Sequence, residues 1–115
     1  MSDLTEARMA ENQSTFREAN ERIEAAADDM GLFEPVPFIC ECAARDCTAI
    51  VRLTLTDYED VRSNPRRFFN VPGHEALSVE AGAAVVVETT PGYVLVDKVG
   101  VAGEISKERY RELAD

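Results

Sequence analysis

Positively charged residues are scarce in this sequence, and so are segments that could attach the protein to a membrane. The 115 residues include 12 lysines and arginines against 22 aspartates and glutamates, for a formal net charge of −10. Nucleic-acid affinity rests on cationic side chains that neutralise phosphates, so this charge disfavours nucleic acid as a partner. No run approaches 18 apolar residues and no basic-then-apolar leader opens the chain. We therefore expect a cytoplasmic protein without membrane contact.

Tryptophan is absent, and the chain has only one histidine and three cysteines. Hydrophobic residues make up 45% and charged residues 30%, which excludes a wholly disordered chain. A domain of 12.7 kDa buries roughly two-thirds of its unfolded surface, so its core is modest. An added covalent or metal cross-link would therefore help to stabilise the fold.

Three arginines form the one local concentration of positive charge, around Asn64-Pro65. We expect them to pair with the acidic residues that precede them in the chain. The arginines are Arg62, Arg66 and Arg67, and the expected partners are Asp57, Glu59 and Asp60.

Residues 4–30 contain neither proline nor glycine and predict one long helix that ends at Gly31. Met9, Phe16 and Ile23 recur every seven residues and form a narrow apolar stripe. A helix of this length runs about 40 Å, longer than a domain of this size is wide. Either it lies over the sheet or it associates with a second copy through the stripe, giving a homodimer. We accordingly divide the chain into an N-terminal helix, 1–34, and an α+β domain, 35–115.

The centre of the chain predicts a hairpin followed by a short helix. Residues 38–42 and 47–53 are rich in β-forming side chains and flank a polar turn. Thr56 and Glu59 match a capping box, which predicts a helix from Asp57 to about Asn64 with Tyr58 and Val61 on its apolar face.

The C-terminal half predicts two strong strands and a last helix. Residues 85–88 and 93–96 are the strands, and Thr90-Pro91-Gly92-Tyr93 between them suits a type II turn. Both faces of this hairpin are partly apolar, so we expect each to be covered. Gly100 and Gly103 should loosen the chain before a short helix from about Lys107. The fold class is therefore α+β: a long N-terminal helix, a small, mainly antiparallel sheet and short helices.

All three cysteines fall within eight residues, and the only histidine follows in a Pro-Gly-His-Glu turn. Three thiols and one imidazole are a usual ligand set for structural Zn²⁺. Residues i and i+2 of a strand share a face, so Cys40 and Cys42 can both reach one ion, and a turn can return Cys47 beside them. The predicted zinc ligands are Cys40, Cys42, Cys47 and His74, with Glu75 close to the site.

Other interpretations of the cysteines remain open. A disulfide leaves one thiol over and is disfavoured in a reducing cytoplasm. An iron–sulfur cluster normally needs a fourth cysteine. Redox-active thiols and inert buried thiols are the remaining alternatives. If His74 were not a ligand, three thiolates would leave an open position on the zinc for water, with Glu41 or Glu75 as the base of a small zinc hydrolase.

The middle of the chain resembles a group of small uncharacterised bacterial proteins, common in actinobacteria, that share a C-x-C-x4-C…P-G-H-E layout. The resemblance covers about residues 20–99 and rests on residues 38–47, 53–62, 67–68 and 71–75. It implies that the three cysteines and His74 belong to one site, and it implies no activity. The chain departs from this pattern at residues 81–84 and at its C-terminal end.

From these features we predict a non-enzymatic, zinc-binding module with a structural Cys3His site that acts through a protein partner in interaction or regulation. The alternative is a redox- or metal-sensing switch that uses the same thiolates. A small zinc hydrolase is the third hypothesis.

Overall fold

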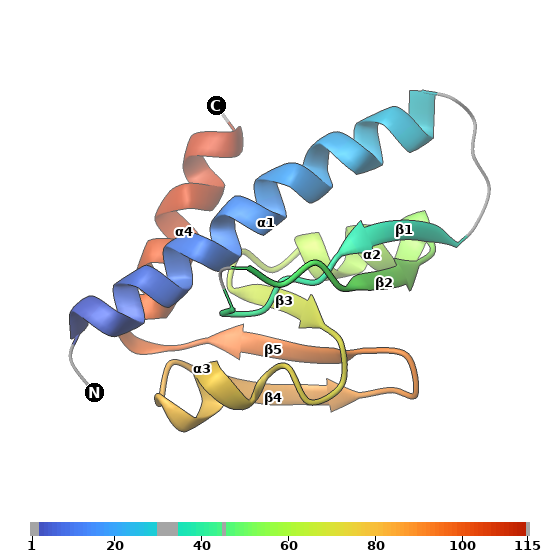
Figure 1. Ribbon diagram of the computed structural model, residues 1–115. Coiled ribbons are helices and arrows are strands. Elements are labelled where there is room, and N and C mark those ends of the chain that lie inside the picture. The colour runs from blue at the N-terminus through green and yellow to red at the C-terminus, as the bar shows by residue number, and fades with distance from the viewer. Residues whose placement is uncertain (1–2, 30–34, 45, 115) are drawn as a thin grey trace.

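The computed structural model describes residues 3–29, 35–44 and 46–114, and its helices and strands make an α+β fold, as predicted (Figure 1). No helix in these ranges is both long and apolar enough to cross a bilayer. In chain order, the elements are α1 (Asp3–Asp29), β1 (Val36–Ile39), β2 (Ile50–Leu53), α2 (Leu55–Arg62), β3 (Arg67–Asn70), α3 (Ala76–Glu80), β4 (Ala84–Thr89), β5 (Val94–Lys98) and α4 (Gly100–Ala114).

The strands form two antiparallel sheets: β1 pairs with β2, and the other three lie in the order β3-β5-β4. The sheets meet where the chain leaves β1, because the backbone N–H of Glu41 donates to the carbonyl of Phe69 in β3 at 2.9 Å. Three buried rings fill the space beside this junction. Phe38 stacks on Tyr58 at 4.3 Å between ring centroids, and Phe69 meets both rings edge-on.

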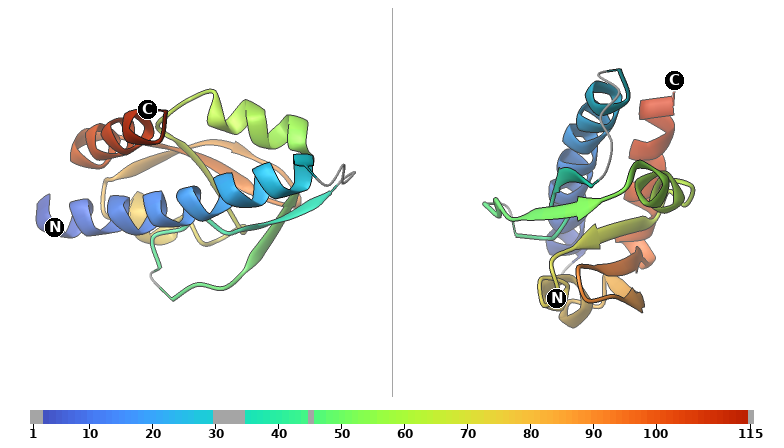
Figure 2. Two further views of the ribbon diagram at one scale, coloured as in Figure 1. Left: turned by 90° about the horizontal axis from the view of Figure 1, so that it is seen from above. Right: turned by 90° about the vertical axis from the view of Figure 1, so that its right-hand side faces the viewer.

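Helix α1 crosses the molecule and packs against α4 and β1 (Figures 1 and 2). Its buried face is mainly polar, so it differs from the apolar stripe that the sequence predicts. The Asn20 amide binds the β1 backbone as a neighbouring strand would, accepting from the N–H of Ile39 and donating to its carbonyl, both at 2.8 Å. Among the α1 side chains that the structure describes, the buried ones are Gln13, Ser14, Arg17, Asn20 and Ala27.

The predicted apolar stripe therefore does not form the main buried face of α1. Ile23 packs against the core cluster and Phe16 is half-buried. The side chain of Met9, and the predicted helix end at Gly31, lie outside the described residues. Self-association through the stripe stays a prediction.

Three local expectations are wrong. Helix α2 begins two residues earlier than predicted, because Thr54, not Thr56, caps it: the Thr54 hydroxyl accepts the N–H of Asp57 at 3.0 Å. Gly92 lacks the positive φ of a type II turn, and the Thr90 hydroxyl closes that turn by bonding both backbone groups of Tyr93.

The third error concerns α4, which begins at Gly100 rather than near Lys107. Gly103 is buried inside this helix instead of loosening the chain. A Cβ at Gly103 would lie 2.8 Å from the carbonyl oxygen of Lys98, so glycine permits the close approach of α4 to β5.

The three clustered arginines do form ion pairs, but with acids that are distant in sequence. Arg62 pairs with Glu41 at 2.6 Å, Arg66 with Glu104 at 3.3 Å and Arg67 with Asp97 at 2.8 Å. The predicted partners Asp57, Glu59 and Asp60 are exposed. The expectation that both faces of the β4–β5 hairpin are covered is wrong as well, because every residue of β4 after Ala84 is exposed.

Candidate metal centre

The first two thiols come from the short segment that follows β1. Cys40 extends the pairing of β1 with β2 by one hydrogen bond, because its backbone N–H donates to the carbonyl of Ala49 at 3.0 Å. Because the chain is still extended here, Cys40 and Cys42 point to one side and Glu41 to the other. The cysteines, which the sequence predicted inside the two extended pieces of this hairpin, therefore lie just beyond the ends of β1 and β2. Both thiols are buried.

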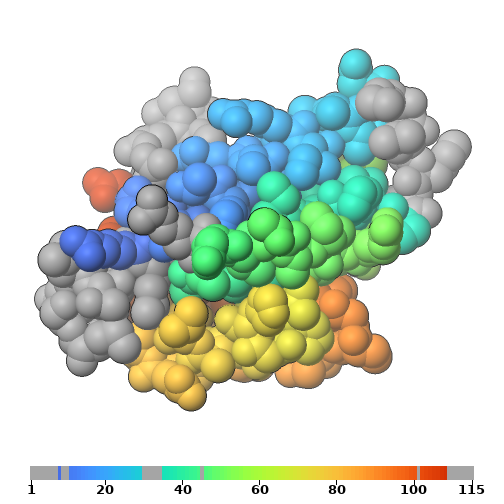
Figure 3. All heavy atoms as spheres, in the orientation of Figure 1, coloured from blue at the N-terminus to red at the C-terminus, as the bar shows by residue number. Residues whose placement is uncertain are grey.

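The third thiol is returned by the loop between β1 and β2. The backbone N–H of Cys47 donates to the carbonyl of Ala44 at 3.2 Å, which closes a tight turn and brings Cys47 back toward the first pair. Cys47 is half-buried, so it is the most accessible of the three thiols. The green segment that follows the Cys47 turn lies between α1 and the yellow turn before α3 in the space-filling view (Figure 3).

A rigid turn after β3 supplies the imidazole. Gly73 has a φ of +97°, which favours glycine, and the N–H of His74 donates to the carbonyl of Val71 at 2.9 Å. The carboxylate of Glu75 accepts from the N–H of Gly73 at 2.9 Å and from the Asn70 amide at 3.1 Å. Glu75 therefore holds the turn that carries His74.

The four predicted residues meet in space. The Nδ1 atom of His74 lies 3.6 Å from the Sγ atoms of both Cys40 and Cys47. The Sγ atom of Cys42 completes the set, and the four ligand atoms all lie within 4.8 Å of one another. Tetrahedral zinc with bonds near 2.3 Å to sulfur and about 2.0 Å to nitrogen needs separations of about 3.8 Å between sulfurs and about 3.5 Å between sulfur and nitrogen. The cluster therefore matches the size of a tetrahedral metal site.

The backbone around the thiols favours negative charge on sulfur. The N–H of Val71 donates to the Cys40 sulfur at 3.3 Å. The pKa of Cys42 is lowered to about 5, chiefly by a hydrogen bond with the Cys40 thiol and further by the N–H of Ala44 and by His74. The same interaction raises the pKa of Cys40, and burial adds to it. Before an ion binds, Cys42 is therefore ionised more readily than Cys40.

Glu41 faces away from the thiols into the interior and is fully buried. Burial raises the pKa of Glu41, and this is opposed chiefly by Arg62, then by the Asn20 amide. These groups bind the carboxylate at 2.6 Å and 2.8 Å. This role of Glu41 was not predicted, although the alternation in Cys-Glu-Cys is a signal for it: two thiols on one side place the carboxylate on the other.

A small cavity of about 230 Å³ adjoins the thiol–imidazole cluster. Cys42 and His74 form one wall, and the remaining walls are small or apolar, including Ala76 and Leu77 of α3. Neither Glu41 nor Glu75 lines it, so this opening offers no carboxylate to the cluster.

Comparison of the chain with protein-family models, with curated proteins and with solved structures gave no match. The resemblance to small bacterial proteins with a C-x-C-x4-C…P-G-H-E layout therefore stays an expectation, and the functional argument rests on the site.

Proposed function

We propose that this protein is a non-enzymatic, zinc-stabilised module that acts through protein contacts, in interaction or in regulation. The observation that carries the proposal is the convergence of three thiols and one imidazole, from three separate segments, within 4.8 Å. Thiolate with imidazole in tetrahedral geometry is the donor set that zinc prefers. Cys40, Cys42, Cys47 and His74 are its ligands.

A structural role is favoured over a catalytic one by the occupation of the nearby carboxylates. Four protein ligands complete a tetrahedral zinc site, whereas a hydrolase needs an open position and a free base. Glu41 is buried against Arg62, and Glu75 is bound by the N–H of Gly73 and the amide of Asn70. Neither is free to take a proton from a metal-bound water, which leaves the zinc hydrolase as the weakest hypothesis.

Elemental analysis of protein purified without chelators tests the proposal. We expect one zinc per chain, and less than half an equivalent would reject it. Substitution with cobalt should give thiolate-to-cobalt charge-transfer absorption that weakens in Cys47→Ser and shifts in His74→Ala. The matched control is Thr48→Ala, beside Cys47 but outside the cluster, which should bind one cobalt unchanged.

A redox- or metal-sensing switch is the second candidate, favoured by the exposure of Cys47 and by sulfur atoms within 4.8 Å of one another. One molecule of hydrogen peroxide would take two electrons from two thiolates, forming one S–S bond of about 2.05 Å and, with two protons, two waters, while zinc leaves. Reversible zinc release by dilute peroxide, with an altered partner affinity, would favour the switch. Release that irreversibly unfolds the chain would favour the structural role.

Homodimerisation through Met9, Phe16 and Ile23 is part of the same proposal and is tested separately. Removing residues 1–20 would delete buried groups of α1, so a point substitution is the better probe. Light scattering should give a doubled mass that Phe16→Glu halves, with exposed Arg22→Glu as the control. A monomeric mass for the unmodified protein would reject the dimer and leave the zinc site standing.

A further inference from the structure

Exposed apolar side chains are concentrated on α3 and β4. Six large hydrophobic side chains in the described residues are strongly exposed, and five of them lie between residues 77 and 87. The three consecutive valines of β4 carry most of this surface: Val85, Val86 and Val87 are 50%, 46% and 44% exposed. Scattered exposed apolar residues are normal, but a concentration of this kind marks an interaction site.

Strand β4 is also an edge strand. It pairs with β5 on one side, and nothing within the described ranges pairs with its other edge (Figure 1). An edge strand presents unpaired N–H and C=O groups to any extended chain of suitable sequence. Natural proteins usually shield such an edge with lysine or proline, and residues 84–87 contain neither.

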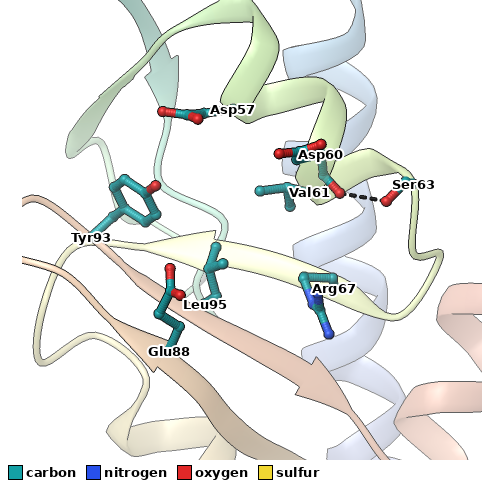
Figure 4. A pocket seen from close by; sticks show the side chains of 8 residues that line it. All are labelled: Asp57, Asp60, Val61, Ser63, Arg67, Glu88, Tyr93 and Leu95. Atoms are coloured by element: carbon teal, nitrogen blue, oxygen red, sulfur yellow. Dashed lines mark hydrogen bonds between the residues drawn. The ribbon is translucent and has the colours of Figure 1, made fainter.

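An acidic pocket of about 350 Å³ lies between α2 and the sheet, near the C-terminal end of β4 and on the side of that strand that faces β5 (Figure 4). Asp57 and Asp60 reach it from α2, and Glu88 reaches it from β4. Arg67 also lines the pocket, but its guanidinium is bound to both carboxylate oxygens of Asp97, at 2.8 Å and 3.0 Å. No lysine or arginine in the described part of the chain forms an ion pair with the other three carboxylates.

The charge and the shape of this edge decide what binds there. A second copy would bring another net charge of −10 to the same place. A bulge between Val86 and Glu88 also twists the strand, which disfavours flat pairing with an identical edge. A short segment that carries lysine or arginine beside its apolar residues avoids the charge repulsion and can pair on one side of the bulge.

We propose that the free edge of β4 binds an extended segment of a partner protein, which adds a strand to the sheet, packs apolar side chains on the three valines and places a lysine or arginine against Glu88, the β4 carboxylate of the acidic pocket. Backbone hydrogen bonds supply affinity in this mode, and side-chain pockets supply specificity. The inference rests on the proposed role in protein interaction and names its partner class. It does not depend on which metal fills the Cys3His site.

The test uses the full-length protein and a capped peptide, KKVTVTVKK, titrated while amide resonances are followed. We expect saturable binding, with the shifts concentrated in β4, from Val85 to Glu88. The acidic peptide EEVTVTVEE should bind at least about tenfold more weakly, since it reverses the charge complementarity. The peptide KKVTPTVKK should also bind more weakly, because proline removes a backbone donor.

Two matched variants locate the contact. Val85→Lys should weaken peptide binding at least about tenfold, whereas Ile50→Lys should leave it unchanged, because both residues are 50% exposed and lie on different sheets. Glu88→Gln should weaken binding and reduce its dependence on salt, since one carboxylate is lost from the acidic pocket.

Three outcomes would overturn the proposal: no saturable binding, equal loss in Ile50→Lys, or a dimer that Val85→Lys dissociates. The last would assign the edge to a second copy. Zinc measured on the same samples separates this test from that of the proposed function. If zinc-loaded protein does not bind the peptide, only the proposed docking site is rejected. If zinc-free protein is folded and binds the peptide, only the structural role of zinc is rejected.

Discussion

The two sheets of this protein are held together in different ways. The β1–β2 sheet has two four-residue strands, and the loop that joins them carries all three thiols. The β3-β5-β4 sheet has three strands, two of them joined by a short turn, and supplies one candidate ligand, His74, from the turn after β3. The first is therefore expected to depend on an ion and on buried polar contacts, whereas the second depends on strand pairing and leaves one edge free.

The largest expected effect comes from removing a thiol, which acts mainly on the first sheet. Cys40→Ser should abolish zinc binding, because its sulfur contacts His74 at 3.6 Å and sits in the buried part of the cluster. Zinc binding to such sets is worth about 10–16 kcal/mol, comparable with the whole stability of a domain. Hydrogen exchange should show β1–β2 opening before β5, and Thr48→Ser is the control. Uniform protection in both sheets would contradict the comparison.

The second prediction distinguishes the stability that comes from the buried polar contacts of Glu41 from the stability that comes from metal binding. Glu41→Gln removes the anion that faces Arg62 and leaves that guanidinium buried without a counter-charge. We expect a loss of about 3–5 kcal/mol in the free energy of unfolding, measured by urea titration, with zinc content still at one per chain. Exposed Glu59→Gln should be neutral. Loss of zinc without loss of stability would show that Glu41 acts on the metal instead.

The third prediction concerns the second sheet and has a distinct pH signature. Lys98 of β5 is buried, and its ammonium lies over the ring of Phe68 with no hydrogen-bond partner. Burial lowers its pKa from 10.5 to about 7, against the opposing charges of Glu41 and Cys42. Because the unfolded chain then binds a proton that the folded chain does not, stability should rise from pH 7 toward pH 10.

Lys98→Met removes this proton linkage while keeping the length of the side chain. The variant should be more stable than the unmodified protein at pH 7, and its advantage should shrink as the pH approaches 10. Chemical unfolding at both pH values measures the difference. A constant difference between the two curves would mean that Lys98 stays charged in the folded protein.

The sequence predicted the elements that local patterns determine, and it missed those that depend on distant contacts. Residues 4–30 lack helix breakers, and the runs near 86 and 95 are rich in β-forming valine, so α1, β4 and β5 were found. The polar face of α1 was not, because Gln13 and Asn20 find their partners in the backbone of residues 39–41 and, for Asn20, in the Glu41 carboxylate as well. No apolar pattern records such hydrogen bonds.

The candidate site divides in the same way. The spacing of the three cysteines and the Pro-Gly-His-Glu turn predicted which residues would meet, and the geometry agrees. The partners of Arg62 and Arg67 could not be predicted, because Glu41 and Asp97 are 21 and 30 residues away in sequence. Proximity in sequence favoured Asp57 and Asp60, which the fold leaves beside the acidic pocket instead.

The smallest expected effect concerns the packing of α4 on the second sheet. In Gly103→Ala, the new methyl group would lie 2.8 Å from the carbonyl oxygen of Lys98, so helix and strand must separate. We expect a loss of about 1–3 kcal/mol, measured by thermal unfolding, although alanine is the better helix former. The matched control is Gly92→Ala, where a Cβ meets nothing within 4 Å and φ is not positive. Equal stability of the two variants would show that α4 shifts freely on β5. Unchanged zinc content in both would show that this contact belongs to the second sheet alone.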